Sequence, residues 1–337
     1  MITLTVSADA AGQRLDKYVR RALRDVPLSH VYKMFRTRKI RVNGARGKAE
    51  QLLQAGDTIV IRGDEERLLE KASPAGAAAK APRPEQVTFG VLHEDADLLV
   101  VDKPAGLAAH PGTGIEGATL VEMARAHLRV PANVPPGEFK PSPAHRLDRE
   151  TSGIVIVAKT RRAMVALTKT FTDGDDVGKA YLALVKGKMP REAGTIDLPL
   201  SEHEQTARSK ERRGVNFQEA LTRWKVLASM KEASLLEVRI ETGRTHQIRR
   251  HMESAGHPVA GDKRYGDFNF NRAARQRWGL RRMFLHAWRL ELPHPVTRAR
   301  LRLEAPLPAE LREVLGRANL QVDRAGPRQV ARGEKEP

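Results

Sequence analysis

A stretch with no apolar period interrupts this sequence at residues 64–86, and it limits the chain to folding around separate cores on either side. Its centre, from Ser73 to Pro84, is made largely of Ala, Pro and Gly, a composition typical of a flexible linker. The 337 residues therefore predict two domains, at 12–63 and 87–318. We expect residues 319–337 to form a disordered basic tail.

The part before the linker has the pattern of a small α/β module. Apolar residues recur at helical spacing from Leu15 to Leu23, with basic residues between them. A second helix is predicted from Ser29 to Arg38, with Ser29 as its N-cap. A short strand at 40–44 should close on its Asn-Gly turn, and a turn leading into a further strand should end the module at 55–61.

The larger part combines apolar runs with helical stretches. The runs predict buried strands at 98–101, 154–157, 181–185 and 235–238. Helices are expected at 120–128 and 162–171. Because strands outnumber helices, this part predicts an α+β domain around a mixed or antiparallel sheet.

The charge of the chain favours a polyanionic partner. Lys and Arg number 59 against 41 Asp and Glu, which leaves a net charge of +18 and a pI near 10.4. Neutralising the phosphates of a nucleic acid releases condensed counterions, so such a surplus favours RNA or DNA, although solubility alone is the alternative explanation. The absence of cysteine excludes disulfides and a catalytic thiol. With no signal-peptide pattern and no long apolar run, we expect a cytoplasmic protein.

The segment 144–153 carries the densest set of chemically useful side chains. Asp148 stands between Arg146 and Arg149, just before an apolar strand. A neighbouring guanidinium keeps a carboxylate ionised, and an ionised carboxylate can act as a nucleophile or a general base. A cluster of surface ion pairs is an equally good reading of this pattern alone.

Two other segments offer candidate site residues. After Thr242 and Gly243 the sequence turns helical from Arg244, so that Arg249 could project towards a site. An Arg can hold a carboxylate or a phosphate in a bidentate pair, but a solvated basic helix face is the simpler alternative. Tyr181 lies at the start of a predicted strand and could stack on a base, although a core Tyr is the more common case.

Several other site types are excluded by spacing. His246, His251 and His257 do not share one helical face, as a zinc site on a helix would require. The glycines at 112–117 are not followed by the Gly-Lys-Ser/Thr of a P-loop, and no Gly-x-Ser-x-Gly elbow occurs. We therefore expect no metal and no nucleotide or redox cofactor.

The segment from His145 to Gly153 resembles the signature of the RluA-type pseudouridine synthases, which reads His-Arg-Leu-Asp, two variable residues, then Thr-Ser-Gly. Further segments resemble later and earlier motifs of that family, in the family's order, across residues 88–306. They are Asp102–Gly106, Lys179–Ala183, Thr242–Arg249, His257–Asp262 and Leu285–Ala287. The resemblance implies an isomerase that converts uridine in RNA to pseudouridine without a cofactor.

The N-terminal part is similar to the S4 RNA-binding module, which is fused to several such synthases. The similarity lies in Gly12–Asp16, Arg41–Gly44 and Ala55–Asp57. It implies RNA contacts from basic side chains, for which we select Arg14, Lys17, Arg36, Arg38, Lys39 and Arg41. Val26–Ser29 and Arg264–Asn269 look closest to the branch that modifies 23S ribosomal RNA, the large-subunit type C.

The same resemblance implies a role for each site residue. Asp148 is the essential carboxylate, which either attacks a carbon or takes a proton from the sugar. Arg249 pairs with it, and Tyr181 stacks on the base. Arg146 fills the gap left by the extruded base, and Ile248 packs beneath the site. The other residues expected to bind the substrate are Arg244 and His145.

Alternatives and departures remain at this point. Many relatives carry Val where this chain has Arg250, which would add a phosphate contact if it faces outward. An RNA-binding assembly factor with an inactive synthase domain is one rival. A glycosidase is the other, but it needs two carboxylates, and only Glu150 lies near Asp148 in the sequence. We expect a monomer.

Overall fold

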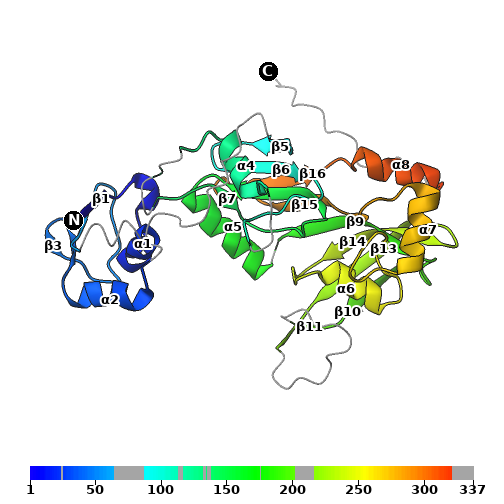
Figure 1. Cartoon of the computed structure of the whole chain (residues 1–337), viewed down its shortest axis with the longest axis horizontal. Helices are drawn as coiled ribbons and strands as arrows, with labels where there is room; N and C mark the ends of the chain where they lie inside the picture. The colour runs from blue at the N-terminus through cyan, green and yellow to red at the C-terminus, as the bar shows by residue number, and fades with distance from the viewer. Residues whose placement is uncertain are drawn as a thin grey trace. The chain divides into compact units, whose positions relative to one another are not determined.

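The computed structural model describes residues 1–23, 26–63, 87–112, 117–131, 134, 138–174, 176–201 and 216–320. The predicted linker at 64–86 and most of the predicted tail lie outside these residues. Figure 1 shows the helices and strands of the chain. By their contacts the residues divide into two compact units. The first unit holds 1–149, 154–177 and 292–303, and the second holds 150–153, 178–291 and 304–337.

The first 61 residues form a four-stranded antiparallel sheet packed on two helices. The strand order is β1-β4-β2-β3, with bounds Ile2–Thr5, Thr58–Ile61, Ile40–Val42 and Ala45–Arg46. The helices are α1 (Leu15–Ala22) and α2 (Leu28–Arg36). Asn43 and Gly44 have φ of 49° and 79°, the left-handed geometry that a tight hairpin turn requires, as the sequence predicts.

Two details of this module differ from the prediction. Helix α2 begins at Leu28, and Pro27 rather than Ser29 is its N-cap, because the N–H groups of His30 and Val31 donate to the Pro27 oxygen. The module also starts before residue 12, since β1 pairs with β4 along its whole length. The helical spacing of apolar residues from Leu15 onwards marks the helix but gives no information about a strand that precedes it.

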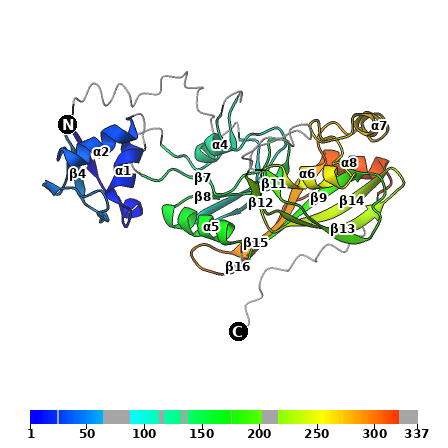
Figure 2. The same ribbon diagram turned by 90° about the horizontal axis from the view of Figure 1, so that it is seen from below.

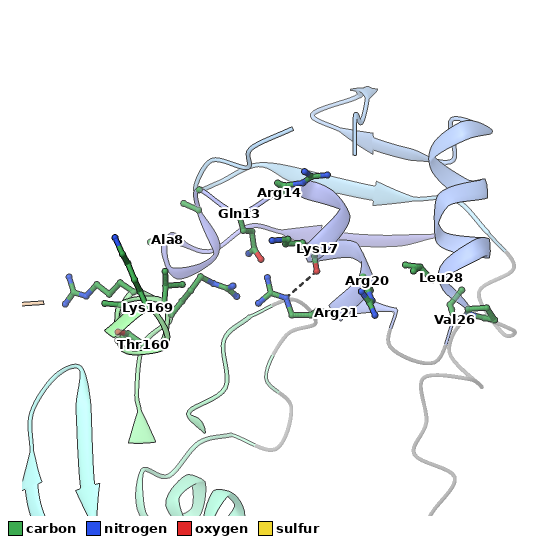
Figure 3. Close-up of a pocket in the computed structure, with 17 residues that line it drawn as sticks. Ala8, Gln13, Arg14, Lys17, Arg20, Arg21, Val26, Leu28, Thr160 and Lys169 are labelled. Atoms are coloured by element: carbon green, nitrogen blue, oxygen red, sulfur yellow. Dashed lines mark hydrogen bonds between the residues drawn. The ribbon is translucent and has the colours of Figure 1, made fainter. Parts of the chain in front are cut away.

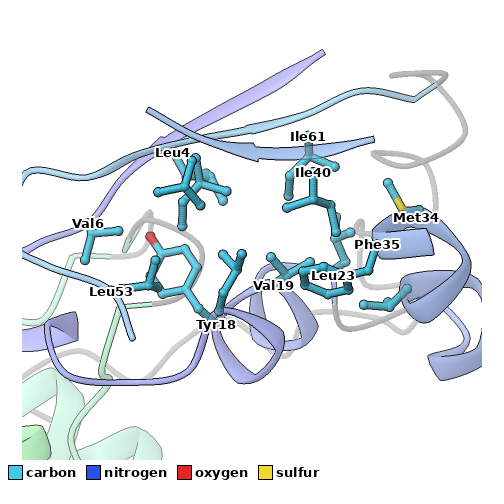
Figure 4. Packing of buried hydrophobic residues seen from close by; sticks show 14 of the residues in the cluster. Leu4, Val6, Tyr18, Val19, Leu23, Met34, Phe35, Ile40, Leu53 and Ile61 are labelled. Atoms are coloured by element: carbon cyan, nitrogen blue, oxygen red, sulfur yellow. The ribbon is translucent and has the colours of Figure 1, made fainter. Parts of the chain in front are cut away.

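The core of this module is closed within its own residues. The two helices and the sheet enclose a cluster of buried side chains that runs from Leu4 to Ile61 and includes Tyr18, which is 1% exposed (Figure 4). Leu15, Val19 and Leu23, which the sequence places on one helical face, all lie in this cluster. The helix is therefore held by its apolar face.

The rest of the first unit contains strands and helices that lead to the candidate site. The strands are β5 (Gly90–Glu94), β6 (Leu98–Lys103), β7 (Ser142–Pro143) and most of β8 (Ser152–Ala158). The helices are α4 (Leu120–His127) and α5 (Arg161–Asp173). Thr119 and Glu122 form a capping box that starts α4, and Thr160 caps α5. The predicted strands and helices here are all present.

The second unit is built on antiparallel strands in the order β10-β13-β14-β9-β15. Their bounds are Ala193–Asp197, Leu221–Ser229, Ala233–Ile240, Gly178–Lys186 and Leu285–Pro293. The first residues of β8 pair with β15 in parallel, at His286 with Ser152 and Ala287 with Gly153. The sheet is therefore mixed, and the α+β class predicted from the sequence is confirmed. The short strands of this unit are β11 (Leu200–Ser201) and β12 (Phe217–Gln218), while β16 (Arg300–Glu304), which pairs with β15, lies almost entirely in the first unit.

Helices of the second unit pack on both faces of its sheet, in two separate clusters of buried side chains. They are α6 (Gln247–Ser254), α7 (Phe268–Trp278) and α8 (Ala309–Arg317). Figure 2 shows these helices together with strands β9, β13 and β14. Side chains alternate between the faces of a strand, and Leu235 packs with α7 and α8 whereas Leu236 packs with α6. Helix α6 therefore packs on the face of the sheet opposite to that covered by α7 and α8.

The end of the described chain corrects one boundary. Leu320, assigned from the sequence to a disordered tail starting at 319, is 4% exposed and packs in the α7–α8 cluster. Its N–H donates to the Leu315 oxygen, so the helix end and one apolar side chain hold it in place. Among the described residues, no helix is long and apolar enough to cross a membrane.

Candidate active site

Asp148 lies in the loop between β7 and β8 and is half-buried, while Arg146 beside it is exposed. The backbone just after Asp148 is fixed by the turn that follows β6. Lys103, fully buried, donates from Nζ to the oxygen of Arg149 at 3.1 Å and to the oxygens of Pro104 and Leu107 at 3.0 Å each. A buried ammonium group thus ties the aspartate loop to a separate part of the sequence.

A second clasp joins the same two segments. The N–H of Gly106 donates to the Arg149 oxygen at 2.8 Å, and Nε of Arg149 donates to the Gly106 oxygen at 2.9 Å. Gly106 has φ of +87°, a conformation that glycine adopts without strain. The Asp102–Gly106 motif therefore forms the support on which the chain around Asp148 rests.

The residues that follow Asp148 enter strand β8 through a buried polar group in the second unit. Ser152 Oγ lies 3.0 Å from His286 Nδ1 and accepts a hydrogen bond from Arg282 Nη2 at 3.1 Å. Burial lowers the pKa of His286 to about 4, so its ring is neutral near pH 7. A Cβ on Gly153 would lie 2.2 Å from the Ala287 oxygen, so the strand crossing accepts only glycine there.

Helix α6 supplies Arg249. The side chain of Arg249 is 11% exposed, and it forms a bidentate pair with Asp262, whose side chain is 0% exposed. The distances are 2.6 Å from Nε to Oδ2 and 3.0 Å from Nη2 to Oδ1. Burial on its own would raise the pKa of Asp262, but the hydrogen bonds from Arg249 and the Tyr265 backbone outweigh it and lower that pKa.

The start of α6 differs from the prediction. The helix begins at Gln247 rather than Arg244, because the Gln247 side chain accepts hydrogen bonds from Thr242 Oγ1 and the Arg244 N–H. His246, with φ of 54°, turns the chain into the helix. Arg244 itself is exposed and donates to the Glu219 oxygen at 3.1 Å.

Tyr181 and Ile248 belong to one packed cluster. Tyr181 is half-buried on β9, and Ile248, 4% exposed, comes from α6. Burial lowers the pKa of Lys179, two residues before Tyr181 on the same strand. The second unit therefore brings together Tyr181, Ile248 and the helix that carries Arg249. Asp148 belongs to the first unit, and its pairing with Arg249 stays a prediction.

Two further predicted residues make contacts that hold the fold. His145 Nε2 accepts from the Ile156 N–H at 3.1 Å, and its ring lies 4.9 Å from that of Phe171. Arg250 is half-buried, and it donates to the oxygen and the hydroxyl of Ser201. His145 thus anchors the aspartate loop to β8, and Arg250 anchors α6 to β11.

The predicted RNA-binding residues lie on the surface of the N-terminal module. Lys17 is exposed on α1, and Arg36, Arg38 and Lys39 are exposed at and beyond the end of α2. Arg41 donates to the Gly44 oxygen. Arg14 instead pairs with Asp16 in a bidentate contact, which neutralises much of its charge.

A cleft within the first unit gathers part of this charge (Figure 3). Its volume is about 1620 Å³, and most of its polar lining is cationic. The basic side chains that line it are Arg14, Lys17, Arg20, Arg21, Arg161, Arg162 and Lys169. Some of them are engaged in the protein, since Arg162 pairs with Asp97. The cleft is suited to a polyanion.

Sequence reasoning gave no role to several residues that shape this region. Lys103, Asp262 and His286 lie in segments that resemble family motifs, but the sequence did not indicate which residues they contact. Their partners lie 46, 13 and 134 positions away in the chain. The available signal was a charged residue inside a motif, because a charge that becomes buried on folding needs a partner. The described residues contain no group of three or more His, Asp or Glu suited to a metal ion.

Known proteins resemble this chain over most of its length. A family model described as RNA pseudouridylate synthase matches residues 97–254. Ribosomal large subunit pseudouridine synthase C of Vibrio cholerae serotype O1 is 37% identical over 312 residues, which cover 93% of this chain and 95% of that protein. The Escherichia coli K12 protein of the same name is 37% identical over 322 residues, with the same coverage.

Solved structures agree. A structure titled human RNA pseudouridylate synthase domain containing 4 aligns with a TM-score of 0.57 at 27% identity, over 71% of this chain and 96% of that one. Another, titled human RNA pseudouridylate synthase domain containing 1, gives a TM-score of 0.52 at 27% identity, over 66% of this chain and 84% of that one.

Proposed function

Because this chain belongs to the RNA pseudouridylate synthase family, we propose that it isomerises uridines of large-subunit ribosomal RNA to pseudouridine. The observation that carries the choice of RNA is the 37% identity to the ribosomal large subunit synthases, which extends over 93% of the chain. A match of that extent includes the N-terminal module as well as the synthase region. It favours a shared target over a shared catalytic domain alone.

The reaction breaks the C1′–N1 bond of a uridine and joins C1′ to C5 of the same base. The C5 proton is lost, and N1 gains one, so atoms and charge balance without a donor or an oxidant. We assign the essential carboxylate to Asp148, acting on the sugar or the base, with Arg249 as the cation that favours its ionised form. Both modes of action for Asp148 fit this balance.

The target base must leave its helix before it can react. Arg146 is exposed beside Asp148, as a side chain that fills the vacated place needs to be. Tyr181 is half-buried and backed by Ile248, which leaves part of its ring for stacking on the base. Arg244, exposed next to α6, is suited to a phosphate rather than to the base.

The N-terminal module is proposed to bind RNA in the manner of an S4 module. Its support is the exposed basic set at Lys17, Arg36, Arg38 and Lys39, together with the cationic cleft. Contacts of this type position RNA without reading bases. The proposal includes a monomer that acts in the cytoplasm, where ribosomal RNA is its substrate.

The test measures tritium release from RNA that carries C5-labelled uridine. We expect the protein to release tritium from labelled 23S transcripts. We also expect pseudouridine at defined positions of cellular 23S RNA, and uridine at those positions in cells that lack the protein. Release from transfer RNA but not from 23S RNA would reject the target and keep the reaction. Release of free uracil would reject the reaction and favour a glycosidase. RNA binding without release would favour the assembly-factor alternative.

A further inference from the structure

The ion pair between Arg249 and Asp262 is buried on both sides, and such a pair adds little net stability by itself. Removing two charges from water is expensive, and an apolar pair of similar volume often serves the fold as well. The side chain of Arg249 is 11% exposed and that of Asp262 is 0% exposed. Stability therefore does not explain why these two charges are placed here.

Asp262 is held by its own surroundings and not only by Arg249. Its Oδ1 accepts from the N–H groups of Arg264 at 2.8 Å and Tyr265 at 3.1 Å. Asn271 Nδ2 donates to its main-chain oxygen at 2.9 Å, while Asn271 Oδ1 accepts from the Gly261 N–H at 2.7 Å. The carboxylate is thus held by hydrogen bonds that do not depend on Arg249, so it can orient the guanidinium.

The aromatic ring of Tyr265 packs against the Arg249 guanidinium. The Cζ of Arg249 lies 5.0 Å from the centre of the Tyr265 ring, a cation–π distance. The Tyr265 hydroxyl lies 3.2 Å from His246 Nδ1, and the two rings meet edge to face at 5.6 Å. Since His246 precedes α6 directly, the ring is fixed to the same helix that carries Arg249. Asp262 and Tyr265 together form a cradle for the guanidinium.

The pairing uses one edge of the guanidinium. Asp262 engages Nε and one N–H of Nη2, so a carboxylate that Arg249 meets in the reaction is met by the opposite edge, through Nη1 and the second N–H of Nη2. A guanidinium is planar, and fixing one edge fixes the direction of the opposite one. Small errors in that direction reduce the rate of a positioned reaction by large factors.

We propose that Asp262 is a positioning residue of the synthase reaction, which orients the Arg249 guanidinium by its Nε–Nη2 edge while the Tyr265 ring packs against the group. This proposal rests on the proposed function of the chain, because it assigns the purpose of the cradle to that reaction. Asp262 does not touch the substrate. It acts through Arg249.

The first experiment compares Asp262→Asn with Asp267→Asn under single- and multiple-turnover conditions. Asn keeps an acceptor for the turn but loses the charge, so we expect kcat to fall on the order of 100-fold and KM to change by less than about threefold. Asp267 is the matched control, since its carboxylate pairs with Lys186 at 2.7 Å and caps α7 at the Phe270 N–H instead of pairing with Arg249. Its variant should keep kcat within about twofold. A raised KM with unchanged kcat in Asp262→Asn would overturn the proposal.

A double-mutant cycle separates positioning from plain stability. If Asp262 acts through Arg249, adding Asp262→Asn to Arg249→Ala should reduce kcat by no more than about a further twofold. Two additive losses would overturn the proposal. If Asp262→Asn does not fold, Tyr265→Leu removes the ring and keeps the ion pair. We then expect kcat to drop several-fold at constant KM, and an unchanged kcat would overturn the proposal.

A readout without turnover keeps the two proposals distinguishable. The ¹⁵N–¹H signal of Arg249 Nε, assigned by its loss in Arg249→Ala, should be protected from solvent exchange in the wild-type chain. In Asp262→Asn that protection should be lost, and in Asp267→Asn it should remain. Wild-type protein that forms no pseudouridine would reject the proposed function, whereas protection that survives in Asp262→Asn would reject the cradle.

Discussion

Lys103 Nζ donates a 3.1 Å hydrogen bond to the main-chain oxygen of Arg149, the residue directly after Asp148. The same ammonium group also holds the oxygens of Pro104 and Leu107. Three backbone carbonyls of two distant segments are thus oriented by one buried charge. The loop that presents Asp148 takes its position from a side chain 46 residues earlier.

Lys103→Met should therefore affect both the fold and the reaction. Met fills the space but donates no hydrogen bond, so we expect a loss of about 2–3 kcal/mol in the free energy of unfolding. The rate should fall at least tenfold, because the Arg149 carbonyl loses one of its two hydrogen-bond donors and the turn at Pro104 and Leu107 loses the same ammonium group. Urea denaturation and tritium release measure these effects. Lys225→Met, at an exposed position on β13, should change stability by less than about 0.5 kcal/mol.

Asp148→Asn should abolish turnover and leave RNA binding nearly intact. The amide is similar in shape but can neither attack as an anion nor accept a proton, so we expect a loss of at least about 10⁴-fold in rate. Tritium release and filter binding give the two quantities. Glu150→Gln, two residues further on, is the matched control and should keep its rate within about threefold. Normal release by Asp148→Asn would remove Asp148 from the mechanism.

The buried His286 should make the stability of the protein depend on pH in acid. Its pKa is about 4 when folded and 6.5 in an unfolded chain, so the unfolded state binds the proton more readily. The stability from the neutral ring is complete above pH 6.5 and is lost as the pH falls towards 4, by about 3 kcal/mol at most.

Denaturation at pH 7 and at pH 4.5 tests this dependence. His286→Gln keeps hydrogen-bonding groups near Ser152 without a titrating ring, so its stability should fall less between the two pH values than that of the wild type. Equal losses in both proteins would mean that His286 does not titrate in this range.

Phosphate contacts by helix α1 should appear in the salt dependence of RNA binding. Lys17 and Arg20 are exposed and line the cationic cleft. Replacing either with Ala should weaken binding about three- to tenfold at low salt and reduce the slope of log Kd against log salt by about 0.7–0.9. Lys231→Ala, in the turn before β14, should leave the slope unchanged. A slope that is the same in all variants would place the RNA elsewhere.

Local pattern was enough to predict much of this fold. The runs at 98–101 and 154–157 were predicted to be strands because they are apolar and too short for helices, and they lie in β6 and β8. The Asn43-Gly44 turn followed from the φ values that it requires. Predictions failed at helix starts, where Pro27 and Gln247 make hydrogen bonds that periodicity does not report.

The supports of the site could not be predicted in the same way. His286 meets Ser152 across 134 positions, and Asp262 meets Arg249 around a turn whose geometry depends on tertiary packing. The compact units also divide the predicted 87–318 domain, since β8 and β15 pass from one unit to the other. Contacts of that range are set by strand pairing and leave no periodic trace in the sequence.

The N-terminal module encloses all of its apolar cluster between Leu4 and Ile61. No side chain of the synthase region is needed to complete that cluster. A gene segment for these residues can therefore be fused to, or lost from, an unrelated enzyme without leaving an unfilled core behind.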